Sequence, residues 1–79
     1  MNTDDSKFLN AFGASLRSAR NSAKISQEEL ASKAGLDRTY ISLLERGKRN
    51  PSLVCIGKLS EALKLPLSVL LDFESYSAQ

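Results

Sequence analysis

The sequence predicts an all-α domain, a compact bundle of five short helices. Apolar residues recur at spacings of three or four, as in Phe8, Phe12 and Leu16, which is the period of one helix face. Residues that start or stop helices, such as Ser26 and Gly35, divide the chain of 79 residues into short segments. The longest apolar runs span only a few residues, too few for a membrane-crossing helix.

The first helix is expected from Lys7 to Ser22, after a polar segment, residues 1–6, that we expect to be flexible. The apolar residues that share its inward face are Phe8, Phe12, Leu16, Ala19 and Ala23. Gly13 lies within this helix and weakens it by about 1 kcal/mol relative to alanine. The helix must therefore depend on packing.

Two short helices joined by a tight corner are predicted in the middle of the chain. Ser26 can start the first, because its hydroxyl can accept from the backbone N–H of Glu29 while the Glu29 carboxylate accepts from the Ser26 N–H. Gly35 can turn the chain through positive φ where this helix ends. Asp37 can cap the second helix, expected over residues 38–46.

The second of these helices should bury Ile41 and Leu44, which are three apart. The side chains that then point away from the core are Arg38, Thr39, Ser42 and Arg46. Arginine and threonine at an exposed helix N-terminus suit recognition of DNA in the major groove, which is wide enough to admit an α-helix. The helix dipole also favours a phosphate at that end.

A polar loop and two further helices complete the prediction. Pro51 disfavours helical geometry at Asn50, so the loop after the second helix of the corner must interrupt the helical structure. The fourth helix should begin near Ser52 and end near Lys64. Its expected inward residues are Leu53, Ile56, Leu59 and Leu63. Pro66 can open a last short helix.

The last helix is apolar nearly all round, so we expect a second subunit to cover what the core does not use. The residues assigned to this dimer interface are Val54, Leu65, Leu67, Val69, Phe73 and Tyr76. The alternative is that Phe73 and Tyr76 fold back on their own domain. We place the domain at residues 7–73 and expect residues 74–79 to be flexible.

The charge distribution indicates a basic surface around the second helix of the corner. The net charge is only +2. From Arg38 to Lys58, however, five basic residues face one acidic residue, giving +4, whereas from Leu59 onward one basic residue faces three acidic ones, giving −2. The alternative is a solvated charged loop without a partner.

Composition argues against several other classes of protein. Without histidine and with a single cysteine, the chain offers neither a structural zinc site nor an internal disulfide. It has no glycine-rich phosphate loop and no base to activate a nucleophile, so we expect no enzyme activity and no cofactor. A core this small leaves little room for a small-molecule pocket. The N-terminus lacks the order of a secretion signal, so we expect a cytoplasmic protein.

Several short stretches around the corner form a recognisable pattern. They are Ser26-Gln27-Glu28-Glu29-Leu30-Ala31, Ala34-Gly35-Leu36, Tyr40-Ile41-Ser42 and Leu44-Glu45-Arg46-Gly47, followed by Pro51 and Leu53. This pattern resembles the Xre/Cro-like helix-turn-helix family of lambdoid phage repressors, over roughly residues 8–71. More narrowly, LDRTYISLLERGKRNPSL is similar to the controller proteins of type II restriction-modification systems. The resemblance implies a lambda-repressor-like DNA-binding domain with the helix-turn-helix at helices two and three.

The resemblance also implies roles for individual residues. In this family the arginine at the Arg20 position pairs with the glutamate at the Glu45 position, and a glutamine at the Gln27 position binds a phosphate while bracing the recognition helix. We expect base contacts from Arg38, Thr39, Tyr40, Ser42 and Leu43. We expect backbone contacts from Gln27, Arg17, Arg46, Lys48, Arg49 and Asn50.

Three of these assignments have alternatives that the residues leave open. Tyr40 can equally be a half-buried core tyrosine. Leu43 can contact a thymine methyl or merely cap the core, and Gln27 can be an indifferent residue at a helix start. Arg38 is the strongest candidate, because its guanidinium can donate two hydrogen bonds to guanine O6 and N7.

The expected function is that of a dimeric, sequence-specific transcriptional regulator on double-stranded DNA with a roughly palindromic operator. The controller resemblance implies action on its own promoter and that of the endonuclease. A second dimer on the same DNA and RNA polymerase are candidate further partners. A phage-type or antitoxin-like repressor is one alternative, and a protein-interaction module without DNA binding is another. No membrane or small-molecule partner is expected.

Overall fold

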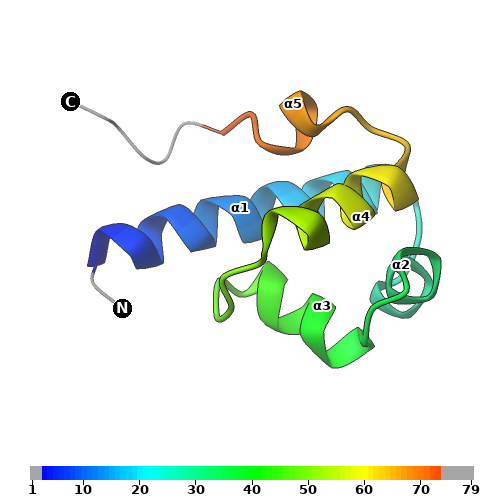
Figure 1. Ribbon diagram of the computed structural model, residues 1–79, viewed down its shortest axis with the longest axis horizontal. Helices are drawn as coiled ribbons and strands as arrows, with labels where there is room; N and C mark the ends of the chain where they lie inside the picture. Colours follow the sequence, from blue (N-terminus) through cyan, green and yellow to red (C-terminus); the bar gives the residue numbers. More distant parts are fainter. Residues whose placement is uncertain (1–2, 74–79) are drawn as a thin grey trace.

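Five helices account for most of the described part of the chain, residues 3–73, in this computed structural model (Figure 1). They are α1 (Thr3–Ser22), α2 (Gln27–Ala34), α3 (Arg38–Glu45), α4 (Leu53–Leu63) and α5 (Leu67–Leu70). Residues 3–73 contain no strand, so the prediction of an all-α bundle of five helices is confirmed. None of these helices combines the length and the apolar content needed to cross a bilayer.

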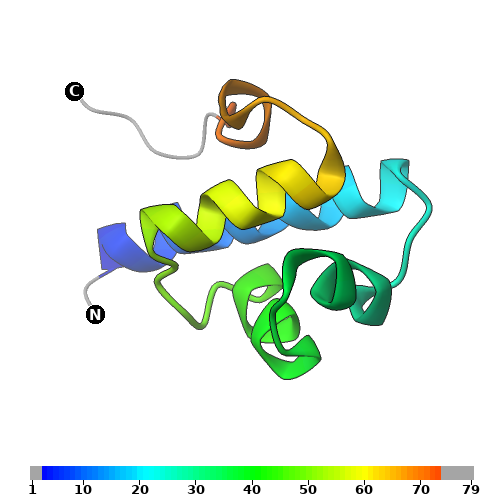
Figure 2. The same ribbon diagram turned by 45° about the vertical axis from the view of Figure 1, so that its right-hand side comes forward.

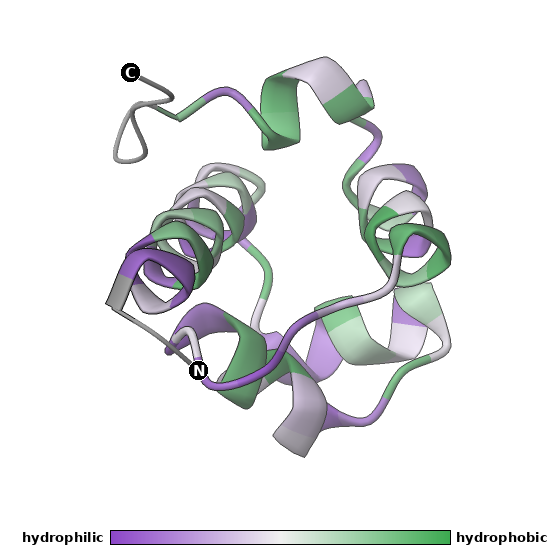
Figure 3. Cartoon of the chain, turned by 60° about the vertical axis from the view of Figure 1, so that its left-hand side comes forward, coloured by the Kyte–Doolittle hydropathy of each residue, from purple (hydrophilic) through white to green (hydrophobic). Residues whose placement is uncertain are grey.

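The helices surround one core. α3 packs against α1 and α2, whereas α5 packs against α1 and α4. In Figures 1 and 2, α3 and α5 therefore lie on opposite sides of α1 and α4. Figure 3 shows α1 and α4 as two walls, with α5 above and the α2–α3 pair below. The larger side chains that meet inside are Phe12, Leu16, Leu30, Ile41, Leu44, Leu59, Leu63 and Leu70.

α1 begins at Thr3, four residues before the predicted start at Lys7. Asp4 and Asp5 lie in its first turn, where carboxylates interact favourably with the positive end of the helix dipole. Of the segment expected to be flexible, residues 3–6 are thus helical, and residues 1–2 lie outside the described part. The domain boundaries themselves stay a prediction.

The inward face of α1 differs from the predicted stripe at both ends. Leu9 is buried, whereas Phe8 and Ala23 are exposed. The Phe8 ring lies edge-on against the Phe73 ring, with the centroids 5.5 Å apart. The predicted helical period of the inward residues was right. At the two ends of α1, however, the elements that it contacts determine which residues are buried.

The prediction that Leu53 points inward was wrong, since 71% of this residue is exposed. Ser52 caps α4 as expected, with its Oγ accepting from the backbone N–H of Cys55 at 3.0 Å. Cys55, Leu59 and Leu63, spaced by four, form the buried face. Leu53 precedes Cys55 by two residues, which is more than half a helical turn, so it projects away from that face.

Two corners are turned by lysines with positive φ, at 59° for Lys24 and 57° for Lys64. The left-handed conformation is disfavoured for side chains with a Cβ by about 1–2 kcal/mol. Lys64 is the C-cap of α4 and adopts the left-handed conformation that glycine adopts without strain. The Ser60 hydroxyl stabilises this corner by donating to the carbonyl oxygen of Leu65.

Gly13 is explained by the close approach of α1 to the end of α3. A Cβ on Gly13 would lie 2.5 Å from the carbonyl oxygens of both Leu44 and Glu45. These are backbone atoms, which cannot move aside as a flexible side chain would. The glycine that weakens α1 therefore allows α3 to pack against it.

We predict that Gly13→Ala destabilises the protein by about 1–3 kcal/mol, although alanine is the better helix former, because overpacking outweighs propensity. Gly57→Ala is the matched control, since a Cβ at Gly57 meets nothing within 4 Å. That control should be neutral or stabilising by up to about 1 kcal/mol. Urea unfolding followed by circular dichroism measures both changes. A Gly13→Ala protein as stable as the Gly57→Ala protein would contradict the close approach.

Candidate nucleic-acid interface

The start and end of α2 are fixed by its own residues. Ser26 Oγ accepts from the Glu29 N–H at 3.0 Å, and the Ser26 N–H donates to Glu29 Oε1 at 3.1 Å. This is the predicted capping box. Gly35 ends the helix with φ of 69°, a conformation that glycine adopts without strain. The corner before α3 is therefore set locally.

α3 is similarly bounded by its neighbours in sequence. Asp37 Oδ1 accepts from the backbone N–H of Thr39 at 2.7 Å. The helix ends at Glu45, one residue before the predicted end, with Arg46 as its C-cap. Gly47 follows with φ of 70°, and a Cβ there would overlap the Asn10 side chain. The chain thus leaves α3 in close contact with α1.

The Glu45 carboxylate joins three helices beneath α3. Arg20 of α1 donates from Nε to Oε2 at 2.6 Å and from Nη2 to Oε1 at 3.0 Å, and its Nη1 donates to the carbonyl oxygen of Ile25 at 3.0 Å. Gln27 of α2 donates from Nε2 to Oε1 at 3.1 Å, and Arg17 of α1 donates from Nε to Oε1 at 3.3 Å. The Arg20–Glu45 ion pair implied by the resemblance is therefore present.

Burial and hydrogen bonding act in opposite directions on Glu45. Its side chain is fully buried, which by itself raises the pKa of the carboxyl group. The hydrogen bonds from Arg20, Gln27 and Arg17 lower the pKa by more, so the net pKa lies below the usual value near 4.5. The hydrogen bond with Glu45 also raises the pKa of Arg20, despite the opposing effect of burial. Glu45 therefore remains an anion at neutral pH.

Arg17 and Arg20 contact the same carboxylate but differ in exposure. The Arg20 side chain is 13% exposed, whereas the Arg17 side chain is 51% exposed. Arg20 is thus largely enclosed, and Arg17 holds the carboxylate through Nε at the rim of the site. The bond from Arg17 was not predicted from the sequence, although its spacing of three residues from Arg20 places both on one helix face.

The outward face of α3 carries the residues expected to read bases. Arg38 and Thr39 are exposed at its N-terminus, and Ser42 and Leu43 are half-buried further along. Tyr40 is half-buried and packs against the core. Burial is the main cause that raises the pKa of Tyr40, and a hydrogen bond with the Cys55 side chain raises it further. This position favours the core interpretation of Tyr40, which the sequence had left open.

The exposed charges within residues 38–58 all have one sign, although the exposed Asp37 cap of α3 lies directly before them. Over residues 38–58 the charged residues at the surface are Arg38, Arg46, Lys48, Arg49 and Lys58. Glu45, the single acid of this stretch, is buried beneath α3 and neutralised by Arg20. Asn50 is exposed in the same loop. The sequence predicted the excess of positive charge, and the structure adds that the opposing charge is absent from the surface of this stretch.

The residues assigned to the dimer interface fall into three groups. Val54, Leu67 and Val69 are exposed, whereas Leu65 and Phe73 pack partly against the core. Tyr76 lies outside the described residues. The fold-back alternative is thus favoured for Phe73.

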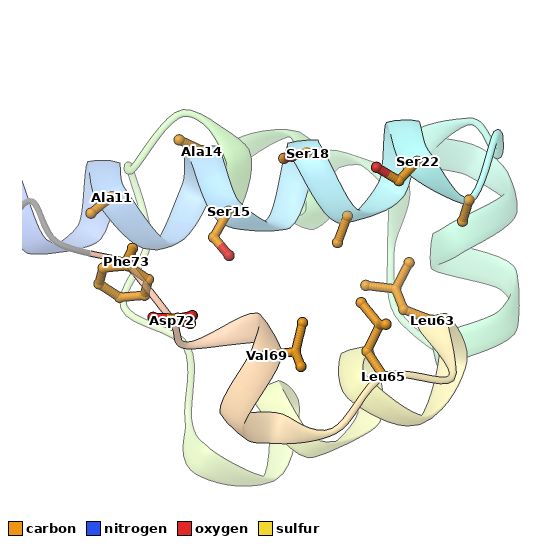
Figure 4. Close-up of a pocket in the computed structure, with 12 residues that line it drawn as sticks. Ala11, Ala14, Ser15, Ser18, Ser22, Leu63, Leu65, Val69, Asp72 and Phe73 are labelled. Carbon is orange, nitrogen blue, oxygen red and sulfur yellow. The ribbon is translucent and has the colours of Figure 1, made fainter.

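An open groove of about 770 Å³ runs between α1 and the α4–α5 segment. Figure 4 shows small alanine and serine side chains on the α1 wall, with Leu63, Leu65, Val69 and Phe73 opposite them. Ser15 Oγ donates to the carbonyl oxygen of Leu70 at 2.6 Å and holds α5 to α1. The groove forms at the surface, where α5 bridges α1, and takes no volume from the core.

The fold and the anchored α3 define the class of protein. A helix-turn-helix family model matches residues 16–70, which is more than half of the chain. The chain belongs to this helix-turn-helix family, as the sequence pattern indicated.

Within this family, the chain is similar to control proteins. It is 51% identical to control protein C.BamHI of Bacillus amyloliquefaciens over 63 residues, covering 78% of each chain. It is 47% identical to control protein C.MunI of a Mycoplasma species over 60 residues, covering 75% of this chain and 81% of the relative. The crystal structure of the restriction-modification controller protein C.AhdI from Aeromonas hydrophila superposes with a TM-score of 0.77 at 48% identity, covering 78% and 94% of the two chains.

The lowered pKa of Glu45 predicts a loss of stability in acid. As the pH falls below about 4.5, the unfolded chain binds a proton at Glu45 before the folded chain does, so the free energy of unfolding decreases until the folded pKa is passed. Glu45→Gln should be less stable at neutral pH and should lack this part of the acid dependence. Urea unfolding at pH values from 7 to about 3 measures both profiles.

Glu61→Gln, at an exposed site of α4, controls for the loss of one carboxylate. If the Glu45→Gln and wild-type profiles ran parallel down to the lowest pH, the buried anion would not contribute as described.

Proposed function

We propose that this protein is a homodimeric, sequence-specific transcriptional regulator of the controller type, acting in the cytoplasm on its own promoter and that of a restriction endonuclease. The observation that carries the proposal is α3 itself: Arg38 and Thr39 are exposed at its N-terminus, Glu45 fixes it from below, and the exposed charges of residues 38–58 are all positive. The similarity to control proteins supports the choice of class.

A rigid α3 is what direct reading of bases requires. The Glu45 hydrogen bonds from α1 and α2 fix the helix before DNA arrives, so binding need not bear the cost of ordering it. Arg38 then stands at the exposed N-terminus, where it can donate two hydrogen bonds to one guanine. Thr39, Ser42 and Leu43 offer smaller polar and apolar contacts along the major groove of the DNA. Tyr40 remains a weaker candidate because it packs against the core.

The basic residues beside α3 suit contacts with the DNA backbone. Arg46, Lys48 and Arg49 are exposed in and before the loop that leads to α4. Exposed basic side chains that follow the recognition helix suit phosphate contacts, which set register and supply salt-dependent affinity. Arg17 can extend this contact, because half of its side chain is exposed. Gln27 donates to Glu45, so we assign it chiefly to bracing α3.

Two copies are needed to read a palindromic site. In a two-fold dimer the two α3 helices would enter successive major grooves about 34 Å apart, on half-sites about 10 base pairs apart. Occupation of one site and then of an adjacent site by a second dimer gives the protein a means to activate at low concentration and repress at high concentration. Contact with RNA polymerase would belong to the activating state.

Selection of bound duplexes from a random pool tests the proposal directly. We expect enrichment of a roughly symmetric sequence whose half-sites are about 10 base pairs apart. A pool that stays random after repeated selection at moderate salt would refute sequence-specific binding. Enrichment of a single unrepeated half-site would refute the dimeric part alone.

We predict that Arg38→Ala and Arg49→Ala weaken binding in different ways. Arg38→Ala should cost about 1–3 kcal/mol on the selected duplex and relax the preference at one base position. Arg49→Ala should weaken binding to all duplexes alike and reduce the slope of log K against log salt by about one. Fluorescence anisotropy titrations on matched and mismatched duplexes at several salt concentrations separate the two effects. A loss confined to one base pair for Arg49→Ala would overturn its assignment.

A further inference from the structure

We infer that the groove between α1 and α5 is the docking site of this chain's own C-terminal segment, with the Tyr76 ring seated beside Val69. Residues 74–79, with the sequence ESYSAQ, lie outside the described part of the structure. The sequence left two places open for Tyr76, a dimer interface or its own domain, and the groove provides the second. In Figures 1 and 2, α5 and α3 lie on opposite sides of α1 and α4, so this docking and the proposed function can fail independently.

The groove is apolar and open in residues 3–73. Val69, on its α5 wall, is 51% exposed, and Figure 4 shows it directed into the groove. The wall on α1 consists of alanine and serine side chains, which extend at most one heavy atom beyond Cβ and leave about 770 Å³ of space. Covering the exposed side chain with another apolar group is favourable, because it removes apolar surface from water.

The chemistry of the groove suits an uncharged aromatic ring that carries a hydroxyl. Among the described residues that line it, Asp72 is the only charged one, so an anion such as a phosphate would be repelled. Hydroxyl groups such as that of Ser18 lie along the α1 wall, where a phenol could hydrogen-bond to them. Tyr76 is the one aromatic residue of the segment 74–79. Its ring can therefore cover Val69 while its hydroxyl group keeps a polar partner.

The described part of the chain ends at the mouth of the groove. Phe73, the last described residue, lines the groove at the end near Ala11 (Figure 4). The backbone turns at this point, since the Asp72 N–H donates to the carbonyl oxygen of Val69 at 3.2 Å and the Phe73 N–H donates to that of Leu71 at 3.2 Å. The segment therefore starts beside the site that it is proposed to fill.

The length of the segment sets how far into the groove it reaches. Tyr76 follows Phe73 by three residues, which span at most about 10 Å. The groove extends along α1 from Ala11 to Ala23, a helix length of about 18 Å. Tyr76 thus reaches the middle of the groove, where Val69 lies in Figure 4. So short a tether gives the ring an effective concentration on the order of millimolar, which favours it over a separate molecule of similar chemistry.

Four substitutions in the full chain test this docking. Tyr76→Ser removes the ring, Tyr76→Phe retains it, and Val69→Ser removes the surface that it covers. Leu67→Ser is the matched control on α5, because Leu67 precedes Val69 by two residues and projects from another side of the helix. Fluorescence of the uncharged dye Nile red reports exposed apolar surface. Urea unfolding at one protein concentration gives the unfolding equilibrium constant of each variant.

We expect Tyr76→Ser to increase dye fluorescence and to raise the unfolding equilibrium constant about tenfold, and Tyr76→Phe to change that constant by no more than about threefold. The effects of Tyr76→Ser and Val69→Ser should be less than additive, whereas those of Tyr76→Ser and Leu67→Ser should add. Additive effects for Tyr76 and Val69, or dye fluorescence unchanged by Tyr76→Ser, would overturn the inference.

Nuclear magnetic resonance distinguishes the segment of the same copy from that of a second copy. In a uniformly labelled sample we expect a nuclear Overhauser effect between the Tyr76 ring and the Val69 methyl groups. In a mixture of labelled and unlabelled protein, an isotope-filtered experiment should show no such effect between copies. An effect between copies would show that the segment is exchanged in a dimer and would overturn docking within one subunit.

Discussion

The structure depends on one buried anion. The Glu45 carboxylate is enclosed beneath α3 and is held by donors from α1 and α2, of which Arg20 supplies two. An unpaired carboxylate in that position would be costly, because desolvation penalises the charge without compensation. All three helices must therefore adopt their native arrangement together before the anion is satisfied. The orientation of α3 follows from this single requirement more than from its eight residues, which are too few for a stable isolated helix.

Close packing and surface charge both follow from how α3 is held. Gly13 lets α1 touch the carbonyl end of α3, which places Arg17 and Arg20 within reach of Glu45. Because Glu45, the one acidic residue of this stretch, is buried, the surface of residues 38–58 carries positive charge alone. The same contact thus fixes the helix that we propose reads the DNA, and it leaves the surface of residues 38–58 electrostatically suited to a polyanion. Fold and binding face are two results of one arrangement.

The sequence predicted what local residues determine and failed where distant contacts decide. The cap at Ser26 and the turn at Gly35 were predictable, because both depend on residues a few positions away. Leu53 was misplaced because it continues the apolar period of α4, and only the packing of Cys55, Leu59 and Leu63 shows that the helix is rotated. The groove could not be predicted, since it arises where α5 crosses the small side chains of α1. The pairing of Arg20 with Glu45 was predicted from the family resemblance, not from the period of the apolar residues.

The residues that hold α3 and the residues it displays are different ones. Glu45 and its donors lie beneath the helix, while Arg38 and Thr39 project from the far side and make no contribution to that anchorage. Substitution of Arg38 or Thr39 should consequently change the free energy of unfolding little. If these side chains read the operator as proposed, a few codon changes in the gene would redirect the protein to a new sequence, and recognition could diverge without rebuilding the architecture that supports it.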